Sequence, residues 1–269
     1  MSGKSPLGEK SGYQGSYSPD LLHSIPREEN RRILGLTAEL PFRGEDLWNA
    51  YELTWLSDKN KPQVATAEFR VPADSPNIIE SKSMKLYLNS FSMTRYREPG
   101  ELTTIITGDL TRVTGGSVSV RLIPLTDSGR IGELAGDCID DLDIDCASVN
   151  VDPGLLGCAD AAVKTEELHS HLLRSLCPVT NQPDSGSILI RYRGQPIDRG
   201  SLLRYLVSYR NHNDFHESCV ERIFLDIKAR CKPERLSVYA RYNRRGGLDI
   251  NPFRSDFEST PENVRLWRQ

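Results

Sequence analysis

The sequence predicts an α+β fold of two related units, each an antiparallel sheet with a pair of helices on one face. Three observations support this prediction. A chain of 269 residues fits one large domain or two small ones. The spacing of apolar residues changes from every second position to helical spacing and back, and it does so twice. Finally, Ile79–Phe91 is similar in letters to Ile197–Tyr209, which indicates an internal duplication.

The first half begins with two strands separated by the polar break Ser57–Pro62, a pattern typical of a β-hairpin with one buried face. From Glu80 the apolar residues recur at helical spacing, and a second, weaker helix and a strand follow. The elements expected here are strands at 47–56 and 65–71, helices at 80–91 and 101–110, and a strand at 117–125.

The second half repeats this order. Its expected elements are a strand at 188–193, helices at 202–209 and 220–231, a strand at 236–242, a turn at 244–247 and a strand at 248–253. Residues 1–20, rich in Gly, Ser and Lys, are expected to form a loose tail. The predicted divisions are therefore a first unit at 21–135, a connecting region at 136–176 and a second unit at 177–269.

Composition narrows the function classes. With 34 basic and 37 acidic side chains the net charge is -3, which argues against direct nucleic-acid binding. The first 30 residues lack the apolar core of a signal peptide, and no apolar run is long enough to span a membrane. Six cysteines without a C-x-x-C pair favour free thiols in a reducing compartment. We therefore expect a cytoplasmic protein that does not bind membranes.

An acidic stretch in the connecting region superficially resembles a calcium loop. Asp141, Asp143 and Asp145 alternate as its first ligands would, but Cys146 stands where the loop needs glycine. Asp152 stands where the loop needs glutamate. A solvated acidic connection is the preferred interpretation, and no metal site is expected.

One cysteine, Cys177, is expected to be accessible to solvent and to a substrate. Cys177 lies in a polar loop with Pro and Gly just before a strand, whereas Cys219 and Cys231 fall on helix stripes and are expected to pack. Asp184 follows seven residues later, and a thiol needs such a nearby base to become nucleophilic. An ordinary loop cysteine beside a turn aspartate explains the same letters, so both interpretations stay open.

Three further segments allow two interpretations each. Asp214 and Glu217 resemble a helix capping box, but His216 and Glu217 could instead face a pocket from a helix N-terminus. Glu80–Lys85 could be a solvated helix start or an anion site, and Arg244–Gly247 could also bind an anion. No P-loop or strand–GxGxxG–helix unit is present, so a nucleotide would not be bound by a Rossmann unit.

Taken together, these segments resemble the QueF family of NADPH-dependent 7-cyano-7-deazaguanine reductases in the queuosine pathway. The segments that carry the resemblance are Glu80–Tyr87, Cys177 with Asp184, Phe215–Glu217 and Arg244–Pro252. The resemblance is to the long, duplicated form of the family and covers nearly the whole chain after the tail. It implies a tandem tunnelling fold and no metal. We expect a homodimer, because the open sheet edges of tunnelling folds need partners.

The resemblance also implies roles. Cys177 would attack the nitrile carbon to form a covalent thioimide, Asp184 would handle protons, and two NADPH molecules would deliver hydrides. The residues implied in catalysis are Cys177, Asp184 and His216. Those implied in substrate binding are Ile79, Glu80, Ser81, Phe215, His216 and Glu217. Those implied in NADPH binding are Ser81, Lys82, Arg245 and Gly246.

The motifs are divided between the two repeats, since the first has Glu-Ser-Lys at its helix start and the second has Cys177 and Phe215–Glu217. Each active site is therefore expected to need residues of both units. Two alternatives stay open: an amidinotransferase relative that forms the same thioimide without NADPH, and a non-catalytic module that binds a purine or pterin.

Overall fold

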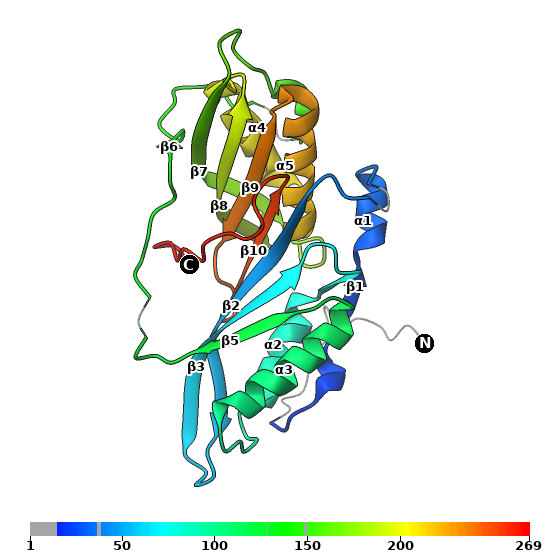
Figure 1. The fold of residues 1–269 in the computed structure, drawn as a ribbon, viewed down its shortest axis with the longest axis vertical. Helices are drawn as coiled ribbons and strands as arrows, with labels where there is room; N and C mark the ends of the chain where they lie inside the picture. The colour runs from blue at the N-terminus through cyan, green and yellow to red at the C-terminus, as the bar shows by residue number, and fades with distance from the viewer. Residues whose placement is uncertain (1–14, 37–38, 128, 148–149) are drawn as a thin grey trace. The chain divides into compact units, whose positions relative to one another are not determined.

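The computed structural model describes residues 15–36, 39–127, 129–147 and 150–269. The chain divides into two compact units (Figure 1). Unit 1 comprises Met1–Leu36, Leu47–Gly129 and Arg244–Asp249, and unit 2 comprises Thr37–Asp46, Arg130–Asn243 and Ile250–Gln269. Both units combine mainly antiparallel strands with helices, so the predicted α+β class is confirmed.

Unit 1 contains the expected hairpin, helix pair and third strand. Three of its strands lie in the order β5-β3-β2, and β1 pairs with β4 in a separate two-stranded sheet. Tyr87 of α2 donates a hydrogen bond to Asp109 of α3 at 2.7 Å. Pro99 begins α3, and Gly115 ends it in a left-handed conformation. The elements are η1 (Pro19–Leu21), β1 (Ser24–Pro26), α1 (Arg27–Ile33), β2 (Arg43–Leu56), β3 (Pro62–Pro72), β4 (Asn77–Ile79), α2 (Ser81–Ser90), α3 (Pro99–Thr114) and β5 (Ser119–Ile123).

The expected loose tail is only partly tested, because residues 1–14 lie outside the described residues. From Tyr17 onward the chain is packed rather than loose. The Tyr17 ring lies 5.1 Å from that of Phe91, and its hydroxyl donates to Asp109 at 2.8 Å. The half-buried Tyr17 ring, which lies against Tyr87 of α2 and against its C-cap residue Phe91, ties this segment to unit 1 in spite of its polar neighbours.

Unit 2 has the strand order β10-β9-β8-β7-β6, in which the short edge strand β6 runs parallel to β7. Arg43–Asp46 of β2 belong to unit 2, and the first two residues of β10 belong to unit 1. The elements are β6 (Asp137–Cys138), η2 (Pro153–Leu155), β7 (Lys164–Leu176), β8 (Pro183–Gly194), α4 (Arg199–Val207), η3 (Ser208–Asn211), α5 (His216–Cys231), β9 (Arg235–Tyr242) and β10 (Leu248–Ser255).

Strand β7 differs from the sequence expectation, which placed its residues in the connecting region 136–176. Two of its buried positions are serines, Ser170 and Ser175, so the strand lacks a clear apolar alternation. A register shift between Ser170 and Leu173 also interrupts the period of two. Because polar residues occupy buried positions and the alternation is interrupted, the spacing of apolar residues does not indicate a strand here.

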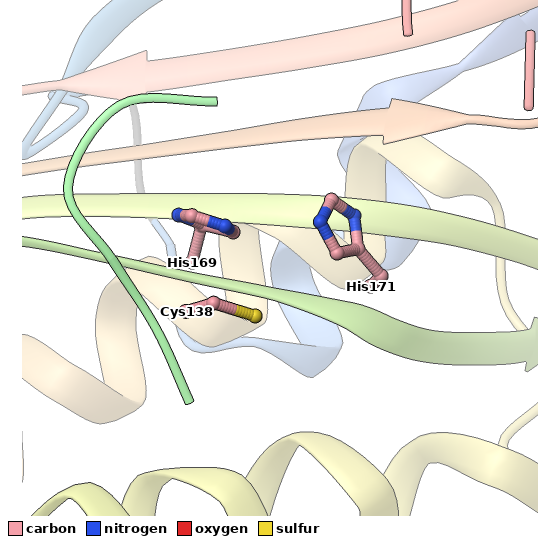
Figure 2. Close-up of side chains that lie close together, drawn as sticks. All are labelled: Cys138, His169 and His171. Carbon is pink, nitrogen blue, oxygen red and sulfur yellow. The ribbon is translucent and has the colours of Figure 1, made fainter. Parts of the chain in front are cut away.

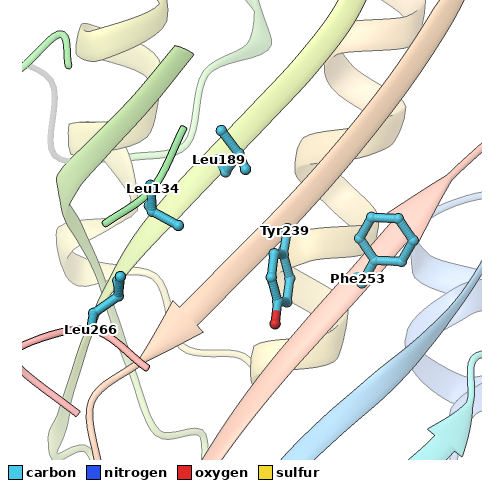
Figure 3. Close-up of a cluster of buried hydrophobic side chains, with 5 residues drawn as sticks. All are labelled: Leu134, Leu189, Tyr239, Phe253 and Leu266. Atoms are coloured by element: carbon cyan, nitrogen blue, oxygen red, sulfur yellow. The ribbon is translucent and has the colours of Figure 1, made fainter. Parts of the chain in front are cut away.

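Part of the unit 2 core lies on one face of β8, β9 and β10 (Figure 3). Leu189 pairs with Tyr239, and Tyr239 pairs with Phe253, so the three side chains share a face. Leu134 and Leu266, from segments outside these strands, complete the cluster.

Among the described residues, no helix has both the length and the apolar character that crossing a bilayer requires.

Candidate functional site

Cys177 lies in the loop that connects β7 to β8. Its N–H donates to the carbonyl of Gln182 at 2.9 Å, and its carbonyl accepts from the N–H of Asn181 at 3.0 Å. These two bonds close the loop on itself and hold the backbone of Cys177. The side chain is half-buried, so the thiol is not sealed in the core.

Asp184 stands on the neighbouring strand, directly opposite Ser175. Opposite residues of an antiparallel pair share a face, and so do residues two apart on one strand. Asp184 and Cys177 are therefore diagonal neighbours on one face of the hairpin. The predicted return of the chain is confirmed, and strand pairing produces it. The Asp184 side chain is only 5% exposed.

A third segment joins the hairpin at the same level. The Leu176 N–H donates to the carbonyl of His212 at 2.8 Å, and the Asp214 N–H donates to the carbonyl of Leu176 at 3.2 Å. This short parallel bridge leads directly into α5. As a result His216 Nε2 lies 3.2 Å from the Asp184 carboxylate.

The ring of His216 is held from a second side by Tyr242, since the two rings stack in parallel with centroids 3.7 Å apart. Its Nδ1 is buried and has no hydrogen-bond partner among the described residues. A buried polar atom without a partner has a desolvation cost that a ligand can remove. The His216 ring is thus oriented, with one nitrogen on Asp184 and the other available for a bound molecule.

The start of α5 does not form the capping box that was one of the two interpretations of its first residues. The N-cap residue is Phe215 rather than Asp214, and it makes no side-chain cap. The Asp214 side chain instead accepts from the N–H of Phe215 at 2.8 Å. Glu217 is the second helical residue and is buried. A buried carboxylate in the first turn of a helix is stabilised by the positive end of the helix dipole.

The two cysteines of α5 differ from Cys177 in their burial. Cys219 and Cys231 are buried, as their helical spacing predicted. Burial raises the pKa of Cys219 strongly and that of Cys231 to about 12, so both stay protonated thiols at neutral pH. All six cysteines are free.

We refer to Cys177, Asp184, His216 and Glu217 as the thiol site.

The second group of predicted residues lies in unit 1. Glu80 caps α2, because its two carboxylate oxygens accept from the N–H groups of Lys82 and Ser83, each at 2.7 Å. Glu80 is 3% exposed, so the interpretation as a solvated helix start is wrong. Two first-turn donors are already used by Glu80. An anion at this helix start would therefore depend mainly on side chains.

The turn Arg244–Gly247 lies against the same helix. Gly246 and Gly247 have φ angles of 58° and 81°, which favour glycine. A Cβ atom on Gly246 would stand only 3.0 Å from Cε of Lys85, and Lys82 lies one helical turn before Lys85. Arg244 stacks over the ring of Tyr51 at 4.8 Å. Unit 1 thus brings together the two segments predicted to bind NADPH, and their basic side chains suit its phosphate groups.

Comparisons with known proteins show the family to which this chain belongs. A family model described as nitrile reductase, 7-cyano-7-deazaguanine-reductase N-term, matches residues 13–122, and one described as QueF-like protein matches residues 183–261. A protein of Dechloromonas aromatica named NADPH-dependent 7-cyano-7-deazaguanine reductase is 54% identical over 98% of this chain and 95% of its own. The chain belongs to the QueF family.

A second curated relative is equally similar, whereas a solved structure is much less so. A protein of Cupriavidus metallidurans with the same name is 54% identical over 98% of both chains. Among solved structures, the apo form of an archaeosine synthase named QueF-Like has 16% identity and a TM-score of 0.32. That similarity covers 37% of this chain and 98% of the other.

The structure also adds a residue that the sequence reasoning missed. Tyr242 alternates with core residues along β9, so its spacing is that of an ordinary buried side chain. Only its stacking on His216 places Tyr242 beside the thiol site, and no signal in the sequence points to it.

Proposed function

We propose that this protein is a reductase that converts the nitrile of 7-cyano-7-deazaguanine to a primary amine at the expense of two NADPH. The observation that supports the proposal is the thiol site, in which half-buried Cys177, with its backbone held in the β7–β8 loop, follows the strand pair Ser175–Asp184, and Asp184 is itself paired to His216. A nucleophile beside an oriented acid–base pair suits covalent catalysis. The names of the 54% identical relatives support the same substrate and cofactor.

The first step is addition of the thiol to the nitrile. The thiolate sulfur of Cys177 bonds to the nitrile carbon, one π bond of the nitrile breaks, and its electron pair moves to nitrogen. Asp184 takes the proton of the thiol and passes it to that nitrogen, so the product is a neutral thioimide. His216 holds the Asp184 carboxylate in place through the contact at 3.2 Å.

The deazaguanine ring would be held by buried polar groups. The carboxylate of Glu217 can accept two parallel N–H bonds from the guanine-like edge, and each charge-assisted bond contributes roughly 1.5–3 kcal/mol. The free Nδ1 of His216 offers a further contact. The other residues proposed to bind substrate are Phe215, Ile79, Glu80 and Ser81.

Ser81, Lys82, Arg245 and Gly246 are proposed to hold NADPH, and Lys85 is suited to assist because it lies against Gly246. When bound, NADPH supplies the two hydrides that the reaction needs. With two protons from the acid–base groups, these four hydrogens convert the nitrile to the amine and release the Cys177 thiol.

An absorbance assay tests the proposed function directly. The purified chain with 7-cyano-7-deazaguanine should consume two equivalents of NADPH per nitrile, with the amine identified by mass spectrometry. A stable covalent adduct without NADPH loss would instead favour the amidinotransferase relative. Reversible binding with neither adduct nor turnover would favour the binding module.

Lys82→Ala separates the two groups of residues. We expect KM for NADPH to rise at least about tenfold, since removing one charge-assisted phosphate contact has a cost of roughly 1.5–3 kcal/mol. Covalent capture of the nitrile by Cys177 should persist, as judged by intact mass. Lys59→Ala, at an exposed lysine in the β2–β3 loop, is the matched control. Loss of capture with unchanged NADPH affinity in Lys82→Ala would contradict this division of roles.

The proposal extends to the larger architecture. The order strand, strand, helix, helix, strand recurs in both units, which supports two tunnelling-fold units in tandem. A homodimer is consistent with the open edge that β5 presents in unit 1. The six free cysteines fit a cytoplasmic role in queuosine biosynthesis.

A further inference from the structure

Three side chains of unit 2 that play no part in the proposed reaction converge at the β6 edge. They are Cys138, His169 and His171, and one possible ligand atom from each lies within 4.8 Å of the other two (Figure 2). The thiol of Cys138 is exposed, and both imidazoles are half-buried. Two nitrogens and one sulfur at this spacing form a donor set that transition-metal ions bind.

The fold explains why these residues meet. Cys138 of β6 is the parallel partner of His169 in β7, and His171 follows two residues later on the same side of β7. Asp140 fastens the two strands, because its carboxylate accepts from the Ser170 hydroxyl at 2.6 Å and from the His171 N–H at 2.9 Å. The register shift in β7 begins directly after Ser170, and such irregularities redirect side chains.

Each imidazole is oriented by a second contact, as metal-binding histidines generally are. His169 Nδ1 lies 3.0 Å from the carbonyl of Ala135, and His171 Nδ1 lies 2.8 Å from the hydroxyl of Ser187. A carbonyl can only accept, so a neutral His169 carries its proton on Nδ1 and its lone pair on Nε2. If the Ser187 hydroxyl accepts, His171 presents Nε2 in the same way.

We propose that Cys138, His169 and His171 bind a borderline-soft divalent metal ion, with Zn²⁺ as the natural occupant. In a tetrahedral Zn²⁺ site the ligand atoms stand about 3.3–3.6 Å apart, so these three must approach by at most about 1.5 Å. Side-chain rotation of the exposed Cys138 can supply much of that approach. A water molecule would take the fourth position. Hard ions such as Ca²⁺ and Mg²⁺ are disfavoured because the three donors include no oxygen.

The surrounding charges are compatible with this site. Asp140 places a carboxylate beside His171, and Arg268, which donates to the His171 carbonyl at 2.9 Å, places a cation near it. Because a thiolate is the form of cysteine that binds a metal ion, binding would release the thiol proton of Cys138. The metal would join the edge strand β6 to β7.

The test uses Co²⁺ as the probe on the full chain, reduced and freed of metal by a chelator. We expect one equivalent to bind, with the strong visible bands of tetrahedral Co²⁺ and a thiolate charge-transfer band in the near ultraviolet, both displaced by Zn²⁺. Cys138→Ser should abolish the charge-transfer band, and His171→Ala should weaken binding. Ser187→Ala, which removes only the second contact of His171, should lower affinity about 10–100-fold.

Three control variants are expected to keep the spectrum unchanged. Cys146→Ser alters another accessible cysteine of unit 2, Cys177→Ala removes the thiol of the proposed active site, and Asp143→Asn alters the acidic stretch. Persistence of the thiolate band in Cys138→Ser, its loss in Cys177→Ala, or only weak octahedral bands sensitive to Asp143→Asn would each overturn the proposal. Nitrile reduction by Cys138→Ser should stay unchanged, so this outcome is independent of the reductase assay.

Discussion

Replacement of Cys177 by alanine is expected to abolish both NADPH oxidation and formation of the covalent adduct. The substitution removes the proposed nucleophile while the loop bonds of residue 177 are made by backbone atoms and remain possible. Loss of the nucleophile should lower turnover by at least about three orders of magnitude, as in other covalent enzymes. Steady-state NADPH absorbance measures turnover, and intact mass after incubation with 7-cyano-7-deazaguanine measures the adduct.

Cys146→Ser provides the matched control, because Cys146 is also partly exposed but lies outside the thiol site. That variant should keep wild-type turnover and adduct mass. Equilibrium binding of the deazaguanine should survive in Cys177→Ala, since the proposed ring contacts come from Glu217 and His216. An adduct that still forms in Cys177→Ala would show that a different residue carries the reaction.

Replacement of Arg254 by leucine is expected to lower the free energy of unfolding by about 3–5 kcal/mol. The guanidinium is fully buried in unit 2 and bonds Asp46 at 2.8 Å and Glu221 at 2.9 Å. Both carboxylates are themselves buried, with 1% and 4% of their side-chain surface exposed. Removing the cation therefore leaves two negative charges in a site without their main counter-ion. Urea unfolding followed by circular dichroism measures the change.

Arg193→Leu is the control for this prediction. Arg193 pairs with Glu234 at 2.8 Å, but the two side chains are 48% and 56% exposed. Exposed pairs contribute roughly 0–1 kcal/mol, so this variant should unfold near the wild-type urea concentration. If Arg254→Leu is too unstable to purify, Arg254→Lys should give an intermediate loss, because it keeps the charge but not the fork of donors. Equal stability of Arg254→Leu and Arg193→Leu would contradict the prediction.

Much of the fold follows from local patterns. The helix that begins near Glu80 is recognisable because Met84, Tyr87, Leu88 and Phe91 recur at helical spacing, and all four are buried. The β2–β3 hairpin is recognisable because one polar break separates two apolar runs. Strand β7 cannot be recognised in this way, since its buried serines and shifted register remove the alternation of apolar and polar residues that predicts a strand.

Within the candidate site, the sequence by itself determined which residues to consider. The motifs that resemble the QueF family select Cys177 with Asp184, Phe215–Glu217 and Lys82, because their letters and their order along the chain can be recognised without any knowledge of the fold. The helical spacing also determined that Cys219 and Cys231 would be buried. Such features are local, since each depends on residues within a few positions along the chain.

Only the tertiary structure decided which of these residues lie together. Strand pairing and the bridge from Leu176 bring His216 to Asp184, across 32 residues of sequence, and α5 begins at His216 without the capping box that its first residues allowed. The same physics joins Gly246 to Lys85 and Cys138 to His169. Contacts of this kind depend on strand register and on the packing of distant segments. A period of two or of 3.6 residues carries no information about either.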